Sequence, residues 1–165
     1  MPIITSLDGK RKDVSCIGCA LRKGIIKTRG GLVFSGRCFV VEQDFEVPIP
    51  GFFVISSRRH IKGFADFNDD EKKEFIEILC KVRRGMEKEL GIELIDLLFR
   101  ESIISSRKNP SHFHVALLPS MPWMKKMPGY CYSAMLDYAK KNLKTKNNLK
   151  KVDVCIEKMK RYLAR

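Results

Sequence analysis

The alternation of apolar and polar positions predicts three short strands in the first third of the chain. β-branched and aromatic residues gather at 32–35, 38–42 and 52–56, and each run is bounded by Gly, Pro or charged residues that interrupt strands. Because short connections separate these runs, we expect the three strands to pair as an antiparallel meander.

A helical spacing replaces this alternation further along the chain. Apolar residues recur at intervals of three and four positions, at Phe75, Leu79, Val82, Met86 and Leu90. Asn68 and Glu71 have the spacing of a capping box, and Gly91 suits the left-handed residue that closes a helix. The pattern predicts one long amphipathic helix, with Cys80 in the core.

The rest of the chain predicts further strands followed by helices. Strands are expected at 94–99 and 112–118, with a polar turn at 105–110 between them, and helical stretches at 130–143 and 150–163. This order predicts the α+β class, with an antiparallel sheet of about five strands, one long helix and additional C-terminal helices. We expect a domain over residues 1–128 and a basic helical C-terminal extension over 129–165.

The length and the apolar runs limit the class of protein. With 165 residues, the chain is long enough to bury one hydrophobic core. It has no apolar run of about 18 residues, which a membrane helix would need, and its first residues lack the apolar stretch of a secretory signal. We therefore expect a cytoplasmic protein with no membrane partner.

The charge is strongly positive and is concentrated at the end of the chain. Lys and Arg number 32 against 19 Asp and Glu, which gives +13 and favours phosphate-bearing ligands over cationic ones. Residues 140–165 hold ten basic and two acidic residues, so ten minus two gives +8 for this segment. A solvated helix face explains such a run more simply than nucleic-acid binding, which stays open as an alternative.

The cysteines favour thiols over disulfides. There are six, at positions 16, 19, 38, 80, 131 and 155. Only Cys16 and Cys19 lie close together, and no export signal accompanies them, so we expect free thiols and one metal-binding pair. A Cys-x-x-Cys pair also occurs in redox proteins or by chance.

Two of the three histidines stand two positions apart in a predicted strand. Side chains alternate between the faces of a strand, so His112 and His114 lie on the same face. The opposite face takes Phe113, Val115 and Leu117, which suit a core. The two histidines therefore lie on the face that a ligand can reach, although an isolated His-x-His pair also arises as surface decoration.

The third histidine completes a candidate metal set, which is Cys16, Cys19, His60 and His112. Zinc binds two thiolates and two imidazoles tetrahedrally, and a closed set of four ligands holds structure rather than performing chemistry. The intervals of 40 residues from Cys19 to His60 and of 51 from His60 to His112 are too long for a nucleic-acid-binding finger. Zinc at this site would instead tie the N-terminal segment to the sheet.

The string SHFHVALLP resembles the His-x-His-x-His-x-x-Pro motif of the histidine triad (HIT) family. CIGC resembles the metal-binding opening of many microbial members of that family. DFEVPIPGFFVISSRRH is similar to the family's Asp-x-x-Pro-x-x-Pro-Gly segment, apart from the first proline, and NDDEKKEF is similar to the acidic start of its long helix. The likeness spans residues 16–119 and implies a HIT-like domain within 1–128.

The resemblance implies a reaction at the α-phosphorus of a nucleotide. His114 matches the middle triad position, which attacks that phosphorus and forms a nucleotidyl-histidine that water or another acceptor resolves. Such a nucleophile needs a neutral imidazole with one nitrogen free, and a hydrogen bond from the other ring nitrogen to a carbonyl provides this state. His112 matches the first position, a zinc ligand in metal-binding members that would hold the strand beside the nucleophile.

The resemblance also implies residues that bind the nucleotide. Asp44 falls where the family places an acidic or amide residue on the ribose hydroxyls, although a turn-forming Asp before Pro48 explains it nearly as well. Arg107 and Lys108 are expected to bind phosphate as charges. Asn109 matches the position of a family hydroxyl that helps the leaving group, and an amide can also donate a hydrogen bond.

The sequence departs from the family pattern around the triad. Ala116 replaces the third His or Gln, which removes a phosphate contact and costs transition-state stabilisation. The loop SSRKNPS lacks the family's Gly-Gln-Ser/Thr, and FRES replaces its Asn-x-Gly, which leaves Glu101 as a surface carboxylate at a strand end. Some members place an aromatic residue near the base or the dimer mate, but for Trp123 core packing is expected.

Three functions are compatible with these features. The first is a nucleotide hydrolase or nucleotidyl transferase that acts on dinucleoside polyphosphates, nucleoside phosphoramidates or adenylylated compounds. The second is a catalytically weakened nucleotide-binding or regulatory protein, which the loss of the third triad histidine favours. The third is a binder or processor of nucleic-acid ends that uses the basic tail. The resemblance further implies a homodimer.

Overall fold

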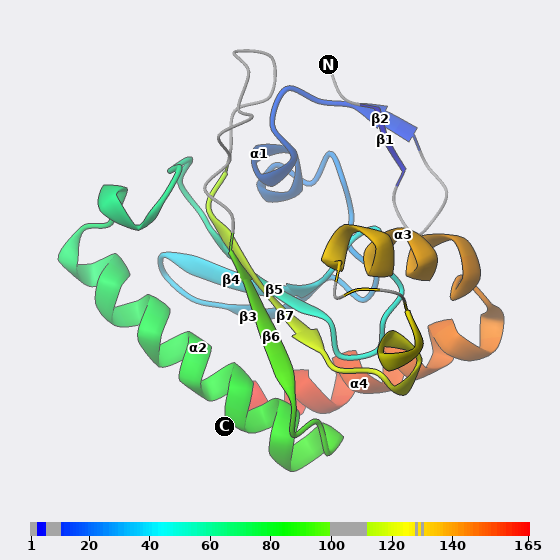
Figure 1. Cartoon of the computed structure of the whole chain (residues 1–165). Coiled ribbons are helices and arrows are strands. Elements are labelled where there is room, and N and C mark those ends of the chain that lie inside the picture. The colour runs from blue at the N-terminus through cyan, green and yellow to red at the C-terminus, as the bar shows by residue number, and fades with distance from the viewer. Residues whose placement is uncertain (1–2, 6–10, 100–111, 128, 130) are drawn as a thin grey trace.

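The computed structural model describes residues 3–5, 11–99, 112–127, 129 and 131–165 (Figure 1). The strands are β1 (Ile3–Thr5), β2 (Arg11–Asp13), β3 (Leu32–Ser35), β4 (Phe39–Gln43), β5 (Phe53–Ser57), β6 (Ile95–Phe99) and β7 (His114–Pro119). The α-helices are α1 (Ile17–Arg22), α2 (Asp69–Leu90), α3 (Tyr132–Asn142) and α4 (Lys146–Leu163), and short 3-10 turns occur at Phe64–Asp66 and Pro122–Lys126. The predicted polar turn at 105–110 lies outside the described residues.

Five of the strands form one antiparallel sheet in the order β3-β4-β5-β7-β6. The meander of the first three sheet strands is confirmed, and β7 inserts between β5 and β6. β1 and β2 pair separately as a two-stranded ribbon that the sequence pattern did not predict. The chain therefore has the predicted α+β class with a five-stranded antiparallel sheet, a long helix and two C-terminal helices.

The long helix α2 has the predicted ends. Asn68 accepts the backbone N–H of Glu71 through its side chain, while the Glu71 carboxylate accepts the backbone N–H of Asn68. Gly91 closes the helix with a φ of 66°, a left-handed value that disfavours side chains. The prediction that Cys80 is buried is wrong, because Cys80 lies two residues, or about 200°, from the buried Ile78.

The two faces of the sheet cover different cores. One face packs against α2 and α4, and its buried residues include Phe39, Phe53, Phe113, Val115 and Leu117. The opposite face packs partly against α3, and its buried residues include Phe52, Ala116, Leu118, Met135 and Ala139. Phe113, Val115 and Leu117 therefore face the core as predicted, on the α2 side of the sheet. The histidine face lies opposite, and it also packs a second core that the sequence did not predict.

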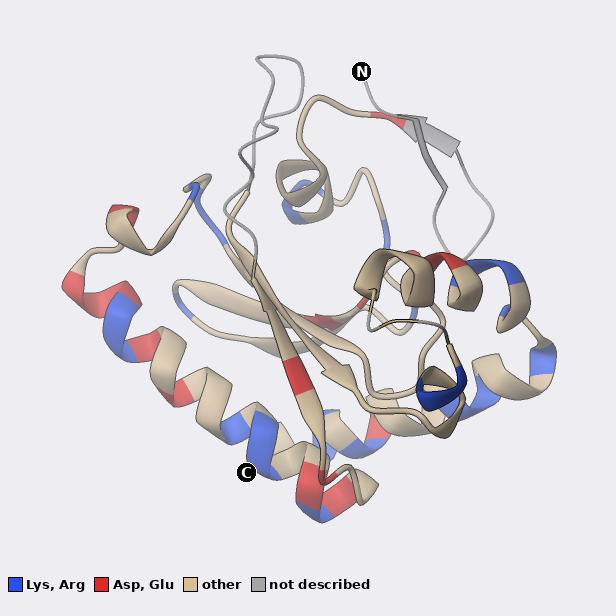
Figure 2. Ribbon diagram, in the orientation of Figure 1, with Lys and Arg blue, Asp and Glu red and all other residues tan. Residues whose placement is uncertain are grey.

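The C-terminal helices are amphipathic. α4 buries Val152, Ile156, Met159 and Leu163 in the same core as α2. Most of its Lys and Arg residues are exposed, and Figure 2 marks their positions along the ribbon in blue. The helix begins earlier than the predicted residue 150, because the Thr145 side chain accepts the backbone N–H of Asn148 and caps it. The division of the chain at residue 128 stays a prediction.

None of the helices in the described ranges is long and apolar enough to cross a membrane.

Candidate functional site

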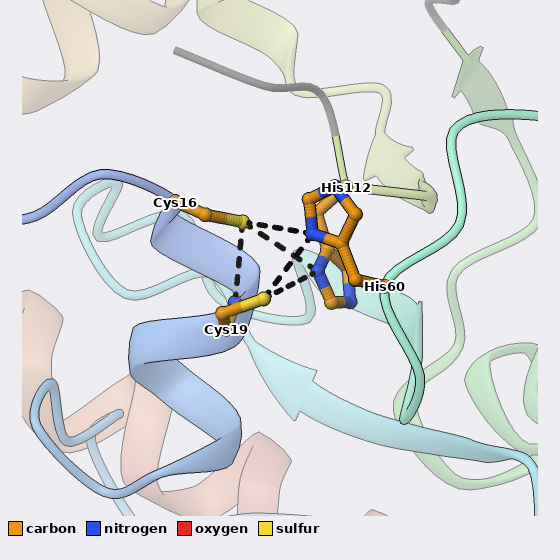
Figure 3. A group of neighbouring side chains, drawn as sticks. All are labelled: Cys16, Cys19, His60 and His112. Carbon is orange, nitrogen blue, oxygen red and sulfur yellow. Dashed lines mark hydrogen bonds between the residues drawn. The ribbon is translucent and has the colours of Figure 1, made fainter. Parts of the chain in front are cut away.

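Four metal-binding side chains meet at the N-terminal end of α1. Cys16 caps α1, and its sulfur accepts the backbone N–H of Cys19 at 3.4 Å, so the helix turn brings both thiols to one side. His60 follows β5 and His112 precedes β7. Figure 3 shows the two thiols and the two imidazole rings directed toward one another. The four predicted metal residues are therefore brought together.

The distances within this cluster fit a tetrahedral zinc ion. Nδ1 of His60 lies 3.5 Å from the sulfur of Cys16 and 3.2 Å from that of Cys19. Nδ1 of His112 lies 3.6 Å from each sulfur. Zinc–sulfur bonds of about 2.3 Å and zinc–nitrogen bonds of about 2.0–2.1 Å place sulfur and nitrogen about 3.6 Å apart in a tetrahedron. Cys16, Cys19, His60 and His112 therefore suit zinc binding as a closed, structural set.

Hydrogen bonding and burial prepare His112 as a ligand. Its Nε2 lies 2.9 Å from the carbonyl oxygen of Ser57. A carbonyl only accepts, so Nε2 carries the hydrogen and the lone pair of Nδ1 points toward the thiols. Burial lowers the pKa of His112, which favours the neutral ring that binds a metal.

Gly18, within CIGC, is required by the close approach of α1 to His112. A Cβ atom at Gly18 would lie 2.2 Å from Cγ and 2.5 Å from Cδ2 of the His112 ring. These atoms cannot overlap, so a side chain at this position would displace the ring. This role of Gly18 could not be predicted from the sequence, because its neighbour across the contact, His112, lies far away along the chain.

A cavity of about 640 Å³ opens beside the cluster, on the sheet face opposite α2. Its walls come from α1, from strands β4 to β7 and from α3. His112, His114 and Ala116 all line it, as the alternation of β7 predicted. The basic C-terminal segment contributes Tyr132, Ser133 and Leu136 of α3 to the wall, a role the sequence did not predict.

His114 is exposed to the cavity with one ring nitrogen fixed. Its Nδ1 lies 2.9 Å from the backbone carbonyl oxygen of His112, so Nδ1 carries the hydrogen. No described residue hydrogen-bonds Nε2, whose lone pair is therefore free. The predicted hydrogen bond from a ring nitrogen to a carbonyl is present, and the carbonyl belongs to a residue of the metal cluster.

Asp44 forms a turn and also lines the cavity. Its Oδ1 accepts the backbone N–H groups of Glu46 at 2.9 Å and Val47 at 2.7 Å, so the turn-forming interpretation is confirmed. Burial raises the pKa of the Asp44 carboxyl group, and the two backbone N–H groups act in the opposite direction. Its predicted contact with ribose stays a prediction.

A buried ion pair that the sequence analysis missed stands at the cavity wall. The guanidinium of Arg22 in α1 donates to the carboxylate of Glu42 in β4, whose side chain is only 5% exposed. Burial raises the pKa of Glu42 and lowers that of Arg22, and each partner opposes the shift of the other. The signal in the sequence was Glu42 itself, a charged residue within a strand of otherwise apolar and amide residues.

Three predicted site residues, Arg107, Lys108 and Asn109, lie outside the described residues, as does Glu101.

Trp123 packs against the α3 side of the sheet, as predicted, with its ring 5.0 Å from that of Tyr138. All six cysteines are free, in agreement with the expected absence of disulfides.

No protein-family model matches the sequence, and no curated protein matches it. Solved structures, in contrast, are similar to the chain over most of its length. One is a zinc-bound histidine triad family protein from Mycobacterium smegmatis, with a TM-score of 0.61 and 11% identity over 88% of this chain and 93% of that chain.

Two more of these structures carry the same family name. A hypothetical histidine triad nucleotide-binding protein from Sulfolobus tokodaii has a TM-score of 0.58 and 14% identity over 88% of this chain and 93% of that one. A HIT family protein from Bacillus subtilis has a TM-score of 0.57 and 17% identity over 88% of this chain and 96% of that one. At these identities the likeness shows the fold, which is that of the histidine triad proteins.

Proposed function

We propose that this protein, which has the fold of the histidine triad proteins, is a nucleotide hydrolase or nucleotidyl transferase acting at the α-phosphorus. The observation that carries the proposal is the state of His114. Its Nδ1 hydrogen is held by the His112 carbonyl 2.9 Å away, which leaves the Nε2 lone pair free beside the cavity. A neutral imidazole with one directed lone pair is the form in which histidine acts as a nucleophile.

The reaction takes place in two steps at Nε2 of His114. The Nε2 lone pair forms a bond to the α-phosphorus, while the bond from phosphorus to the leaving group breaks and the leaving group departs with that electron pair and takes up a proton. A water molecule, or the hydroxyl of another acceptor, then attacks the phosphorus and releases its proton to solvent. The nitrogen–phosphorus bond breaks, and its electrons return to Nε2.

The metal cluster is linked to the nucleophile through His112. Zinc, when bound, supplies a cross-link between the N-terminal segment and the two chain segments that hold His60 and His112. The His112 carbonyl that orients His114 belongs to one of these ligands. Holding His112 in place therefore holds the imidazole of His114, so we assign the metal a positioning role.

The cavity provides groups suited to the rest of a nucleotide. Its volume of about 640 Å³ lies within the range of small-molecule sites. Asp44, on its wall, is proposed to accept the ribose hydroxyls through its carboxylate. Arg107 and Lys108 are proposed to attract the phosphates, and Asn109 to assist the leaving group. The net charge of +13 favours such anionic substrates.

Dinucleoside polyphosphates and nucleoside phosphoramidates are the proposed substrate classes. One observation favours a second candidate, a nucleotide-binding or regulatory protein with weakened catalysis. Ala116 lines the cavity two residues after His114, and its methyl group cannot donate to a phosphate oxygen. A homodimer and nucleic-acid binding through the basic tail stay predictions.

A turnover assay separates the two candidates. The zinc-loaded protein is incubated with dinucleoside polyphosphates and nucleoside phosphoramidates, and the nucleotide products are identified by chromatography. We expect mononucleotide release by the wild type and a loss of at least about 10³-fold in His114→Ala, because the nucleophile is removed. Circular dichroism and zinc content serve as controls for folding. Binding without turnover in the wild type would favour the regulatory protein.

A further inference from the structure

Ser56 stands directly opposite the proposed nucleophile. The register of the sheet pairs Ser56 of β5 with His114 of β7. Residues directly opposite in an antiparallel sheet share a face, with Cβ atoms about 4.5–5.5 Å apart. Ser56, like His114, lines the cavity. The two side chains are therefore close neighbours on the surface that a ligand contacts.

The hydroxyl of Ser56 lacks a partner. Ser56 is 3% exposed, and within the described part of the chain its Oγ forms no hydrogen bond. The adjacent Ser57, on the other face, donates to the carbonyl of Arg59 at 2.9 Å. Buried hydroxyls are usually paired, since an unpaired one is unfavourable. An unpaired hydroxyl in a cavity wall is explained when a ligand supplies the partner.

The sheet around His114 offers few other side-chain donors to a ligand, whereas the hydroxyl-bearing Thr28, Tyr132 and Ser133 line the cavity from outside the sheet. Val54, Ala116 and Leu98 line the same part of the sheet, and none of them can donate a hydrogen bond. Glu42 and Asp44 line the cavity as well, and the oxygens of a carboxylate accept hydrogen bonds without donating them. Among the described residues of the sheet, Ser56 is therefore the hydroxyl donor paired in register with His114.

We propose that Ser56 is a phosphate-binding residue, whose hydroxyl donates to a non-bridging oxygen of the phosphoryl group positioned at Nε2 of His114. The assignment rests on the proposed function. A phosphorus atom about to bond to Nε2 carries oxygens that extend sideways over the neighbouring strand, where Ser56 stands. Donation from Ser56 partly replaces the contact that Ala116 cannot make, since a hydrogen bond to an anionic oxygen is stronger than one to a neutral group.

The test compares two ligands that differ only in the phosphate. Binding of AMP and of adenosine to the zinc-loaded full chain is measured by calorimetry for the wild type and Ser56→Ala. We expect Ser56→Ala to bind AMP about 10- to 100-fold more weakly and adenosine unchanged, since one hydrogen bond to a charged group is lost. Ser120→Ala, just after the end of β7 and outside the cavity wall, should change neither affinity.

The outcomes separate this assignment from the proposed function. Equal losses for AMP and adenosine, or no loss for AMP, would overturn the role of Ser56. A wild type that binds AMP without turning over any substrate would contradict the enzyme, while the two-ligand comparison still decides the role of Ser56. If the wild type binds neither ligand, both proposals fail. Where turnover occurs, Ser56→Ala should lower kcat/KM by a factor similar to its loss of AMP affinity.

Discussion

His112 and His114 stand two residues apart and line the same cavity, yet their surroundings are opposite. His112 is 7% exposed, and both of its ring nitrogens face partners, the thiols on one side and the Ser57 carbonyl on the other. His114 is exposed and has only Nδ1 engaged. An imidazole with both ring nitrogens engaged therefore holds structure, whereas one with a free nitrogen beside a cavity is available for chemistry.

The same contrast extends to the groups around each histidine. The metal cluster has four ligands at mutual distances that suit one zinc ion. Among the described residues of the cavity wall, the buried atoms Ser56 Oγ and Gln43 Oε1 form no hydrogen bond. The chain therefore supplies all four side chains of the cluster, whereas the cavity wall has polar groups for a ligand to satisfy.

Removing the metal should have the largest effect on stability. Chelation, or the double change Cys16→Ser and Cys19→Ser, should lower the free energy of unfolding by at least about 5 kcal/mol, since structural zinc contributes directly to folding. Urea denaturation measures this loss. Cys131→Ser, an exposed thiol outside the cluster, is the matched control and should change little. Unaltered stability after complete zinc removal would show that the cluster is not structural.

Breaking the ion pair between Arg22 and Glu42 should have the second-largest effect on stability. Glu42→Ala leaves the buried guanidinium of Arg22 without its counter-charge, and we expect a loss of about 3–5 kcal/mol in the free energy of unfolding. Thermal and urea unfolding measure it. The double variant Glu42→Ala/Arg22→Ala removes both charges and should be less destabilised than the two single losses added together. Additive losses would mean that the two side chains do not interact.

Gly18→Ala should disturb the cluster through a single methyl group. The added Cβ would overlap the His112 ring, so we expect zinc affinity to fall by about 10- to 100-fold, the loss typical when the support of a metal ligand is altered. Competition with a chromophoric chelator measures the affinity. Ser15→Ala, an exposed change next to Cys16, should leave it unaltered. Equal affinities for the two variants would refute the close contact.

The smallest expected effect concerns the link between the cluster and α2. Arg59, next to the metal ligand His60, pairs with the buried Glu71 at 2.6 Å and lowers its pKa. A lowered pKa adds stability above the ordinary glutamate value of about 4.3, and this is lost as pH falls through the folded-state value. Glu71→Gln should therefore cost about 1 kcal/mol at pH 7, and its stability should converge with the wild type in acid.

Urea denaturation between pH 3 and pH 7 distinguishes this effect from general acid unfolding. Glu77→Gln, an exposed position on α2, supplies the control and should follow the wild type throughout the range. A difference between wild type and Glu71→Gln that stays constant down to the lowest pH would contradict the lowered pKa.

The features that depend on local sequence were predictable. The capping residues and Gly91 specify the ends of α2 within a few positions, and alternation along β7 is enough to assign its side chains to two faces. The metal cluster was also predictable, because only Cys and neutral His side chains serve as soft zinc ligands and the chain offers few of them. The ligand chemistry of these side chains was therefore enough to select the four residues of the cluster, although the sequence gives no distances between them.

The features that depend on contacts between distant segments were not predictable. The partner of Glu42 lies on α1, and the reason for Gly18 is a ring 94 positions away, as 112 minus 18 shows. The role proposed for Ser56 depends on the register of the sheet, which pairs it with His114. The prediction for Cys80 failed because successive residues of α2 are rotated by about 100° around the helix axis. Position 80 therefore falls outside the apolar stripe.

The proposed function requires that Nε2 of His114 forms a covalent bond to phosphorus. Intact-mass spectrometry after brief exposure to an adenine dinucleotide or adenosine phosphoramidate detects this bond. An alkaline quench preserves a phosphorus–nitrogen bond, and peptide mapping locates it. We predict that the wild type gains the mass of one adenylate group on the peptide containing His114, and that His114→Ala gains none. An adenylate on another residue, or turnover of substrate by His114→Ala at the wild-type rate, would contradict the role proposed for His114.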